Sequence, residues 1–352
     1  MIEAPHQKFR VTRAADEASV RSAVLGAAAP ALIGSQLIER AVEASLALTL
    51  NLQQHALPEA YLMLRSTSKP AGMEVISIDH GPGIPAQVQH LLETDDQPRV
   101  SPAESGIFFP RRQGLGLPRV KALADQFEIF SEPKVGTVLL SRFYETAHHL
   151  PNASPLRCGA VSTAIEADGC GDGWGWIRSG ASFSALLVDG LGHGAKAAIA
   201  AQAAVASLRD QADSSVEDYF SRANAAMRKT RGGAASLCRI DTDKNSLQFA
   251  GAGNVEARVF RKVRDSGLMP VPGTLGLSMT SPKVHVTSGD WEPGASLVMH
   301  TDGLRIRFED RLRRLTRHSD PVVLAALLHR DHLKGNDDAS VLVIHDTRQE
   351  IA

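Results

Sequence analysis

Hydrophobic and polar positions in the first part of the chain predict a long helix and three strands. The helix covers residues 34–56, where Ser35 is placed to cap its first turn. A short apolar strand over residues 73–79 ends in a turn, and a strand pair follows at 127–131 and 137–143. These elements belong to one folded segment.

Polar and proline-containing stretches separate the predicted elements. Residues 85–113 are polar, hold Pro98, Pro102 and Pro110, and predict a long loop. Pro118 suits the first turn of a helix that runs to about residue 126. Residues 145–157 show no periodicity and predict a linker between two domains, at 8–144 and 158–346.

The second segment is richer in strands. An apolar strand at 183–188 precedes an alanine-rich helix. Later strands are predicted at 235–240, 246–250, 255–260, 296–300 and 340–345. The last of these, SVLVIH, is as apolar as a buried central strand should be. Because strands dominate the centre and helices the flanks, a layered α/β sandwich is expected.

Length and composition exclude several classes of protein. A chain of 352 residues predicts two domains, and a net charge of -1 offers no basic field for nucleic acid or an anionic membrane. Three cysteines without paired spacing argue against disulfides and zinc. The apolar run at 195–208 is too short to span a bilayer, and no signal peptide opens the sequence. We expect a cytoplasmic protein.

Four aspartates of the second segment stand at or near the ends of predicted strands. Asp172 lies between glycines in CGDGW, and Asp189 ends an apolar strand in ALLVDGLGHG. Asp302 ends another strand in VMHTDG, and Asp337 in GNDDAS, followed directly by Asp338, precedes the last strand. One Asp-Gly pair at a strand end is also typical of a turn. Four in this order indicate a shared site.

Aspartates gathered in this way suit the hydrolysis of phosphate esters. The reaction needs a nucleophilic water and neutralised phosphoryl oxygens, and two divalent cations about 3.5–4 Å apart supply both. Such cations prefer carboxylate and carbonyl oxygens. Gly190 lets a backbone carbonyl approach a metal closely. The set therefore predicts a two-metal phosphatase site.

The motifs resemble the PPM family of metal-dependent protein phosphatases, in its bacterial SpoIIE/RsbX-like branch. The matching runs are DGLGHG at 189–194, TDG at 301–303 and DDAS at 337–340, and the resemblance covers residues 158–346. It implies an α-β-β-α sandwich and hydrolysis of phosphoserine or phosphothreonine with two Mn²⁺ or Mg²⁺ ions.

The resemblance also implies roles for single residues. Asp189 would bridge both metals, and Asp189 and Asp302 are the catalytic candidates. Asp172 and the Gly190 carbonyl would complete one metal site, and Asp302 with Asp337 the other.

Two neighbours of these residues are not expected to bind metal. The family's ligand lies three residues before the Ser/Thr, which favours Asp337 over Asp338. His193 is expected to be a turn residue before the helix rather than a ligand or a general acid.

Two glycine pairs mark the first segment. In ISIDHGPGIP, Asp79 follows a strand and precedes Gly81 and Gly83, so its carboxylate can accept a hydrogen bond from an exocyclic amine. In QGLGLP, Gly114 and Gly116 stand at a helix start, where free backbone N–H groups favour phosphate. In this order they indicate a nucleotide site.

With these motifs, residues 8–144 resemble the GHKL ATP-binding fold, most closely the RsbT-like anti-sigma-factor and switch kinases. A helix asparagine, Asn51, and a late Gly-Thr ending in Thr137 complete the match. The resemblance implies an α/β sandwich with helices on one face of a mixed sheet. It also implies ATP or ADP bound with Mg²⁺, for which Asn51 is the candidate ligand.

The first segment departs from that family at one position. Its kinases carry a glutamate four residues before the asparagine, where this chain has Ala47. Glu43 lies about 12 Å along the helix axis from Asn51, too far to replace it directly. Kinase activity is therefore left open.

The two resemblances together imply bacterial partner switching. The leading hypothesis is a phosphatase of a phosphorylated STAS-domain protein, with an ATP-binding domain that docks this partner. The alternatives are a bifunctional kinase-phosphatase and a non-catalytic module that sequesters a sigma-factor regulator. The oligomeric state is left open, with a homodimer as one option.

Overall fold

The computed structural model divides into two compact units, which are described separately below. One unit is His6–His149, and the other is Leu150–Ala352 with Met1–Pro5. The structure describes residues 3–56, 58–68, 70–93, 116–145, 154–208, 214–280, 283–306 and 320–348.

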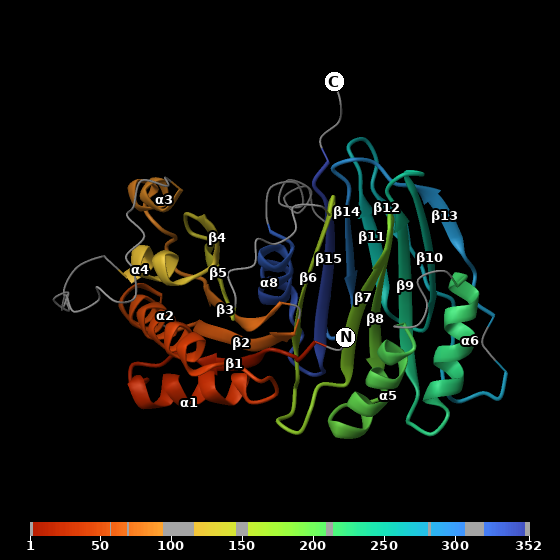
Figure 1. Ribbon diagram of the computed structural model, residues 1–352, viewed down its shortest axis with the longest axis horizontal. Helices are drawn as coiled ribbons and strands as arrows, with labels where there is room; N and C mark the ends of the chain where they lie inside the picture. The colour runs from red at the N-terminus through yellow and green to blue at the C-terminus, as the bar shows by residue number, and fades with distance from the viewer. Residues whose placement is uncertain are drawn as a thin grey trace. The chain divides into compact units, whose positions relative to one another are not determined.

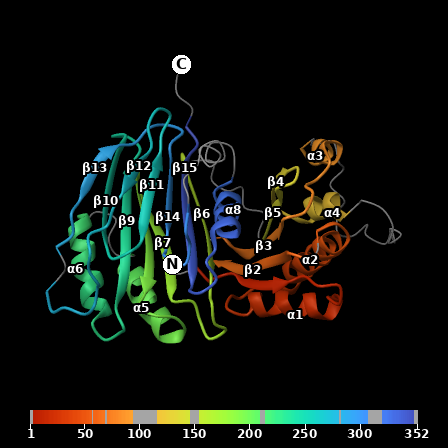
Figure 2. The same ribbon diagram turned by 180° about the vertical axis from the view of Figure 1, so that it is seen from behind.

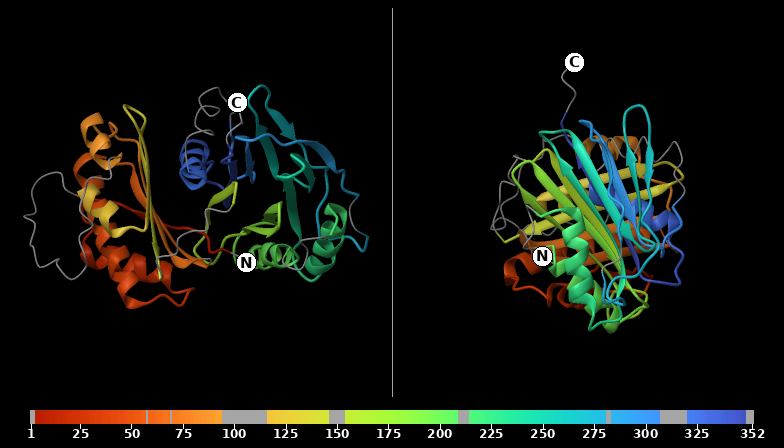
Figure 3. Two further views of the ribbon diagram at one scale, coloured as in Figure 1. Left: turned by 45° about the horizontal axis from the view of Figure 1, so that its top comes forward. Right: turned by 90° about the vertical axis from the view of Figure 1, so that its right-hand side faces the viewer.

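The N-terminal unit is a five-stranded sheet with helices on one face (Figure 3). The strand order is β1-β2-β3-β5-β4. The strands are β1 Gln7–Arg10, β2 Ala60–Ser68, β3 Ala71–Asp79, β4 Gln126–Glu132 and β5 Gly136–Tyr144. The helices are α1 Glu17–Ala28, α2 Ser35–His55, α3 Ala86–Glu93 and α4 Gly116–Leu123.

The described strands of this sheet pair only antiparallel, which corrects the mixed sheet that we expected. β3 and β4 run in the same direction, but β5 lies between them and pairs with both. β4 and β5 form a tight hairpin, whose turn uses positive φ angles at Lys134 and Gly136. The hairpin therefore separates the two parallel strands.

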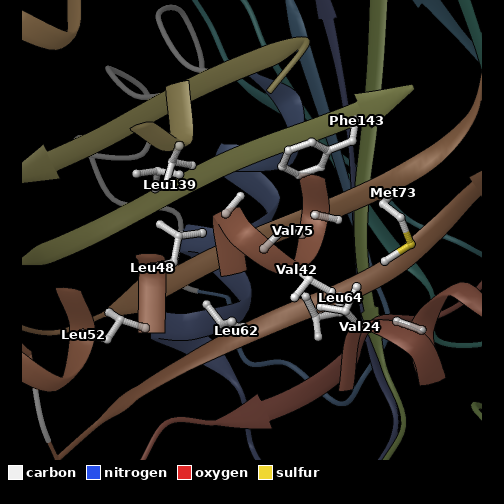
Figure 4. Close-up of a cluster of buried hydrophobic side chains, with 14 of the residues drawn as sticks. Val24, Val42, Leu48, Leu52, Leu62, Leu64, Met73, Val75, Leu139 and Phe143 are labelled. Atoms are coloured by element: carbon white, nitrogen blue, oxygen red, sulfur yellow. The ribbon is translucent and has the colours of Figure 1, made fainter. Parts of the chain in front are cut away.

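The core of the N-terminal unit lies between α2 and the sheet. Leu48 and Leu52 of α2 contribute to the same buried cluster as Leu62, Val75 and Phe143 of the sheet (Figure 4). Each is almost wholly buried, which stabilises the fold by about 1.5–3 kcal/mol per side chain. This packing fixes α2 against β3, the strand that ends at Asp79.

Helix starts in this unit differ from the sequence-based expectation. Ser35 is the first residue of α2, and the N-cap is Gly34, whose backbone N–H is bound by the Glu145 carboxylate. An acidic side chain there also offsets the positive end of the helix dipole. The predicted loop at 85–113 contains α3, while residues 94–115, including Gly114, lie outside the described residues.

The C-terminal unit is a sandwich of two antiparallel sheets (Figures 1 and 2). Their orders are β13-β10-β9-β8-β7 and β12-β11-β14-β15-β6. The strands of the first are β7 Asp172–Ser179, β8 Ser182–Gly190, β9 Gly233–Asp241, β10 Ser246–Ala252 and β13 Thr287–Asp290. Those of the second are β6 Leu156–Thr163, β11 Glu256–Phe260, β12 Ser266–Leu268, β14 Ser296–His300 and β15 Ala339–Asp346.

Helices cover both outer faces of this sandwich. α5 Ala195–Ala206 and α6 Val216–Met227 pack on the first sheet, and α8 Pro321–His332 packs on β6 and β15. Between the sheets lies an apolar core that includes Trp291 and Phe249. The layered sandwich that we predicted is thus present. Among the helices that the structure describes, none combines the length and apolar character of a membrane span.

Candidate functional site

The four predicted aspartates come from strand ends of both sheets of the C-terminal unit. Asp172 opens β7 and lies directly opposite Asp189 of β8 in the antiparallel register. Asp302 follows β14, and Asp337 precedes β15. Since β14 and β15 are neighbours, these two aspartates lie at the same end of the second sheet.

Asn254 joins the aspartates of the two sheets. Its Nδ2 donates to Asp302 Oδ2 at 2.7 Å and to Asp189 Oδ2 at 3.3 Å. Asn254 is exposed and follows β10, where Gly253 takes a φ of +108°. Sequence reasoning missed this residue. Its only signal was an asparagine after the Gly-Ala-Gly run that ends the β10 strand.

Thr301 holds Asp172 in place from the second sheet. Its Oγ1 donates to Asp172 Oδ2 at 2.8 Å and accepts from the Ser340 backbone N–H at 3.0 Å. Ser340 Oγ in turn donates to Ser162 Oγ at 2.7 Å. These buried hydroxyls connect the two sheets beneath the carboxylates. The Thr and Ser of the TDG and DDAS motifs therefore have a structural function that the sequence analysis did not assign.

Burial and like charge raise the pKa of two carboxyl groups in the site. Burial, followed by the charge of Asp302, raises the pKa of Asp189 to about 7. Burial, followed by the charge of Asp189, raises the pKa of Asp172 well above its ordinary value. When carboxyl groups lie this close together, ionising all of them costs free energy unless a cation neutralises their charge. The site therefore has the electrostatics of a cation site.

The donor set of the site fits hard divalent cations, which take carboxylate, carbonyl and water oxygens. Within the described part of the chain, however, no three His, Cys, Asp or Glu side chains already stand as ligands of one ion. The Asn254 amide bonds to one oxygen each of Asp189 and Asp302, so those two oxygens face a hydrogen-bond donor here. A cation that takes both would have to displace this amide.

Gly190 is required by packing. A Cβ on Gly190 would lie 2.4 Å from the Ala197 backbone oxygen, so only glycine lets α5 approach the end of β8. Its N–H donates to the Gly171 carbonyl at 3.0 Å. The predicted role of its own carbonyl toward a metal stays a prediction.

Asp338 and Asp337 have different surroundings. Asp338 is buried, and its two carboxylate oxygens accept from the backbone N–H groups of Ile165 (2.7 Å) and Gly171 (2.5 Å). Asp338 thus holds the loop that precedes β7. Asp337 is half-buried, and its Oδ1 accepts from the Asp338 N–H at 2.9 Å.

His193 lies in the turn before α5, and two charged residues that the sequence analysis did not consider lie beside it. His193 Nδ1 is 3.1 Å from Glu166 Oε1, and both side chains are about half exposed. Arg231 Nη1 donates to the His193 carbonyl at 3.5 Å. A second basic residue, Lys334, lies beside Asp302, because its Nζ donates to the Asp302 backbone carbonyl.

In the N-terminal unit, the structure brings Asp79, Gly81 and Thr137 together. Asp79 is 7% exposed, and its Oδ1 accepts from the backbone N–H groups of Gly81 (2.7 Å) and Thr137 (3.2 Å). Gly83 has a φ of +82°, and a Cβ there would lie 2.8 Å from the Glu132 carbonyl. The end of β3 therefore meets the β4–β5 hairpin at these residues.

The other predicted nucleotide residues lie along α2 and α4. Asn51 is a half-buried residue of α2, and Gly116 opens α4 with its Cβ position 3.6 Å from the Ala47 carbonyl. The acid nearest to Ala47 on that face, Glu43, pairs with Arg119 of α4 at 2.7 Å. Glu43 is thus already engaged by a cation.

An open cavity of about 590 Å³ lies beside Gly81. It is lined by His55, Ala56, Pro58, Glu59, His80, Gly81, Pro82 and Lys134. Of the predicted nucleotide residues, only Gly81 lines it. Its volume alone therefore does not identify a nucleotide site.

Comparisons with known proteins concern mainly the C-terminal unit. The family described as stage II sporulation protein E (SpoIIE) matches residues 179–346. Phosphoserine phosphatase RsbX of Bacillus subtilis (strain 168) is 27% identical over 137 residues, which cover 39% of this chain and 68% of RsbX. These matches confirm the predicted enzyme class, a protein serine/threonine phosphatase, and support the SpoIIE/RsbX-like resemblance.

Two solved structures are similar over the same region. One comes from work on the bacterial stressosome as a modular system adapted to control secondary messenger signalling. It is 27% identical, with a TM-score of 0.51, over 54% of this chain and 98% of its own. The structure of RsbX in complex with magnesium is 22% identical, with a TM-score of 0.48, and the match covers 54% of this chain and 94% of the RsbX chain. The first supports the fold of the C-terminal unit.

Proposed function

We propose that this protein uses two Mn²⁺ or Mg²⁺ ions to remove phosphate from a phosphorylated serine or threonine of a STAS-domain regulator. The observation that carries the proposal is the convergence of Asp172, Asp189, Asp302 and Asp337 at one end of the sandwich. Such crowding of carboxylates is what a pair of divalent cations neutralises.

The aspartates would be divided between two metal positions. Asp189 would bridge them, Asp172 and the Gly190 carbonyl would complete one, and Asp302 with Asp337 would complete the other. When bound, the metals supply a nucleophilic water and neutralise the phosphoryl oxygens. Thr301 orients Asp172 through its 2.8 Å hydrogen bond, and the Asn254 amide holds one oxygen each of Asp189 and Asp302 until a cation displaces it.

The proposed substrate class draws on the similar proteins. RsbX is a phosphoserine phosphatase, and a stressosome structure resembles the C-terminal unit. The proposal places this chain in a bacterial partner-switching pathway, where a STAS-domain protein is both the phosphosubstrate and the binding partner.

The direct test is turnover of a serine-phosphorylated STAS-domain protein, followed by intact mass. We expect loss of one phosphate with Mn²⁺, no loss with EDTA, and no loss for Asp189→Asn. Asp338→Asn is the matched control from the same motifs, and we expect a milder defect because Asp338 binds backbone N–H groups. Metal-independent turnover would refute the two-metal site.

For the N-terminal unit we propose an adenine nucleotide site at Asp79. Two observations support it. The Asp79 carboxylate accepts from the Gly81 and Thr137 N–H groups, and the first residue of α4 lies next to the Ala47 carbonyl. Calorimetry with ATP or ADP and Mg²⁺ should show binding that Asp79→Asn weakens. Glu59→Gln, in the neighbouring cavity, is the control and should bind normally. An effect of Glu59→Gln alone would move the site to that cavity.

We further propose that this unit binds nucleotide but transfers phosphate very slowly. Ala47 offers no base, and the Glu43 carboxylate is paired with Arg119. A general base typically contributes about 10²–10⁴-fold, so Ala47→Glu should raise the rate of phosphorylation of the STAS partner. The assay uses an Asp189→Asn background, which keeps the product. Rapid transfer by that background alone would favour the bifunctional kinase-phosphatase instead.

A further inference from the structure

One exposed segment of the C-terminal unit runs along the edge of the aspartate site. The Val271 N–H donates to Gly251 O at 3.0 Å, and the Gly253 N–H donates to Val271 O at 2.8 Å, directly before Asn254. Farther along, Leu275 forms an antiparallel bridge with Gly233, which itself pairs with the end of β8. The segment thus passes from Asn254 toward the DGLGHG turn.

Residues 276–279 of this segment are firmly anchored to α6. Asn224 is fully buried, donates to the Ser278 carbonyl at 3.2 Å and accepts from the Gly276 N–H at 2.8 Å. Gly276 has a φ of +86°, and a Cβ there would lie 2.8 Å from Met227. Arg228 also donates to the Met279 carbonyl. The backbone here is held by both a buried amide and a surface arginine.

This anchored segment exposes large apolar side chains. Leu277 is 66% exposed and Met279 is 78% exposed, and Leu191 of the DGLGHG turn is 45% exposed. Both leucines lie next to Gly232, whose carbonyl accepts from the Leu191 N–H at 2.9 Å. A Cβ on Gly232 would lie 3.4 Å from the Leu277 Cδ2. Clustered apolar exposure next to a site indicates binding, unlike single exposed leucines.

Basic side chains lie next to the apolar ones. Arg228, Lys229 and Arg231 are exposed and follow α6 directly. The Arg231 guanidinium reaches the DGLGHG turn, where its Nη1 lies 3.0 Å from the position that a Cβ on Gly192 would take. The surface therefore offers both apolar contact and positive charge at the edge of the site. Its natural complement is an apolar segment that carries an anionic group.

We propose that Leu191, Leu277 and Met279, flanked by Arg231, bind the apolar residues that flank the phosphorylated serine or threonine of the substrate. The proposal rests on the phosphatase function proposed above. The phosphoryl group enters the aspartate site, and Arg231 contacts its negative charge from the edge of that site. The flanking apolar side chains lie on Leu277 and Met279. This surface selects the peptide context of the phosphate.

Two synthetic phosphoserine peptides test the proposal. They differ only in the two residues on each side of the phosphoserine, which are leucine in one and serine in the other. With Mn²⁺, we expect the wild type to prefer the leucine peptide by about tenfold in kcat/KM, mostly through KM. The double variant Leu277→Ser, Met279→Ser should lose this preference and keep its kcat.

The matched control is Val263→Ser. Val263 is 83% exposed and lies in the β11–β12 turn, at the opposite end of β11 from Asn254. It should keep the preference for the leucine peptide. All variants should hydrolyse p-nitrophenyl phosphate as the wild type does, because that small ester does not reach the apolar surface.

The outcomes separate the two proposals. Absent hydrolysis of p-nitrophenyl phosphate by the wild type would refute the proposed function itself. Normal hydrolysis of that ester together with equal use of both peptides by the wild type and the double variant would overturn the docking surface alone. A third outcome would assign the surface to a second copy of the chain. In that case light scattering would show a dimer for the wild type and a monomer for the double variant, while both proteins would have the same peptide preference.

Discussion

Glu74 in the N-terminal unit is fully buried and Asp189 in the C-terminal unit is partly buried, yet their surroundings have opposite effects on the carboxyl pKa. Glu74 is fully buried and lies 2.7 Å from Arg65 Nε, 2.7 Å from Arg142 Nε and 3.1 Å from His6 Nε2. Burial opposes its ionisation, but the two arginines and the His6 contact outweigh it and hold the pKa of Glu74 well below its ordinary value. Asp189 has acidic neighbours, and its pKa rises to about 7.

The difference separates a charge that the fold itself neutralises from one for which we propose a function. Around Glu74 the protein supplies its own cations, so the carboxylate is complete as folded. Around Asp189 the protein supplies more acid, and the only close donor to its carboxylate that the structure describes is the neutral amide of Asn254. A buried acid whose pKa is raised by other acids indicates a site that needs a ligand.

The largest expected effect comes from removing the central carboxylate. Asp189→Asn should lower p-nitrophenyl phosphate turnover with Mn²⁺ by about 10³-fold or more, since a metal contributes several kcal/mol to phosphoryl transfer. The same change should leave thermal unfolding in EDTA unchanged or raise its midpoint, because it relieves repulsion with Asp302. A large loss of stability instead would make Asp189 structural and remove the contrast with Glu74.

Removing Glu74 should act on stability alone. Glu74→Ala leaves Arg65 and Arg142 without their shared carboxylate and should destabilise the N-terminal unit by about 3–5 kcal/mol. Hydrogen exchange of β2, β3 and β5 in the full chain measures this loss. Glu59→Gln, whose side chain is 76% exposed, is the control and should stay within about 0.5 kcal/mol. Phosphatase turnover should be unchanged, and a matching loss of turnover would contradict the separation of roles.

A smaller effect is expected for Asn254. Asn254→Ala removes the amide that a cation would have to displace from Asp189 and Asp302, so Mn²⁺ affinity measured by calorimetry should rise by about 10–100-fold. Melting in EDTA should fall, because repulsion between the two carboxylates is then unrelieved. Asn245→Ala, at the exposed turn before β10, is an asparagine control. Unchanged metal affinity and unchanged melting would show that the Asn254 contact is incidental.

The smallest expected effect is a pH dependence of opposite sign in the two units. The folded-state pKa of Asp189 is raised, so its contribution to stability is present below its ordinary pKa of 3.8 and is lost as pH rises through about 7. The folded-state pKa of Glu74 is lowered, so its contribution to stability is present above pH 4.5, its ordinary pKa, and is lost as pH falls through the lower folded-state pKa.

Tryptophan fluorescence measures the first of these trends separately, because all three tryptophans, Trp174, Trp176 and Trp291, lie in the C-terminal unit. In EDTA the melting temperature of the C-terminal unit should fall as pH rises from 5 to 8, by about 2–4 °C for each kcal/mol of unfolding free energy that is lost. Mg²⁺ or Asp189→Asn should flatten the fall. A melting temperature that rises over this range would show that the Asp189 carboxyl is not destabilised by its acidic neighbours.

Strand positions were the most predictable part of this chain. The predicted strands at 73–79, 183–188 and 296–300 lie within β3, β8 and β14, because a run of apolar residues between turn signals has few other ways to be buried. Where local signals were weak, the predicted elements were less accurate. Prolines at 98, 102 and 110 suggested one loop over 85–113, and α3 formed at its start.

The sequence by itself determined the enzyme class, and it predicted which residues of the C-terminal unit carry the chemistry: aspartates at strand ends and glycines beside them. Local patterns suffice for this because strand ends and turns are short-range features. Only the tertiary structure decided how those residues meet. Asn254 reaches Asp189 and Asp302 over 65 and 48 residues, and Asp338 binds Gly171 over 167. Such contacts depend on how two sheets pack, which no local pattern records.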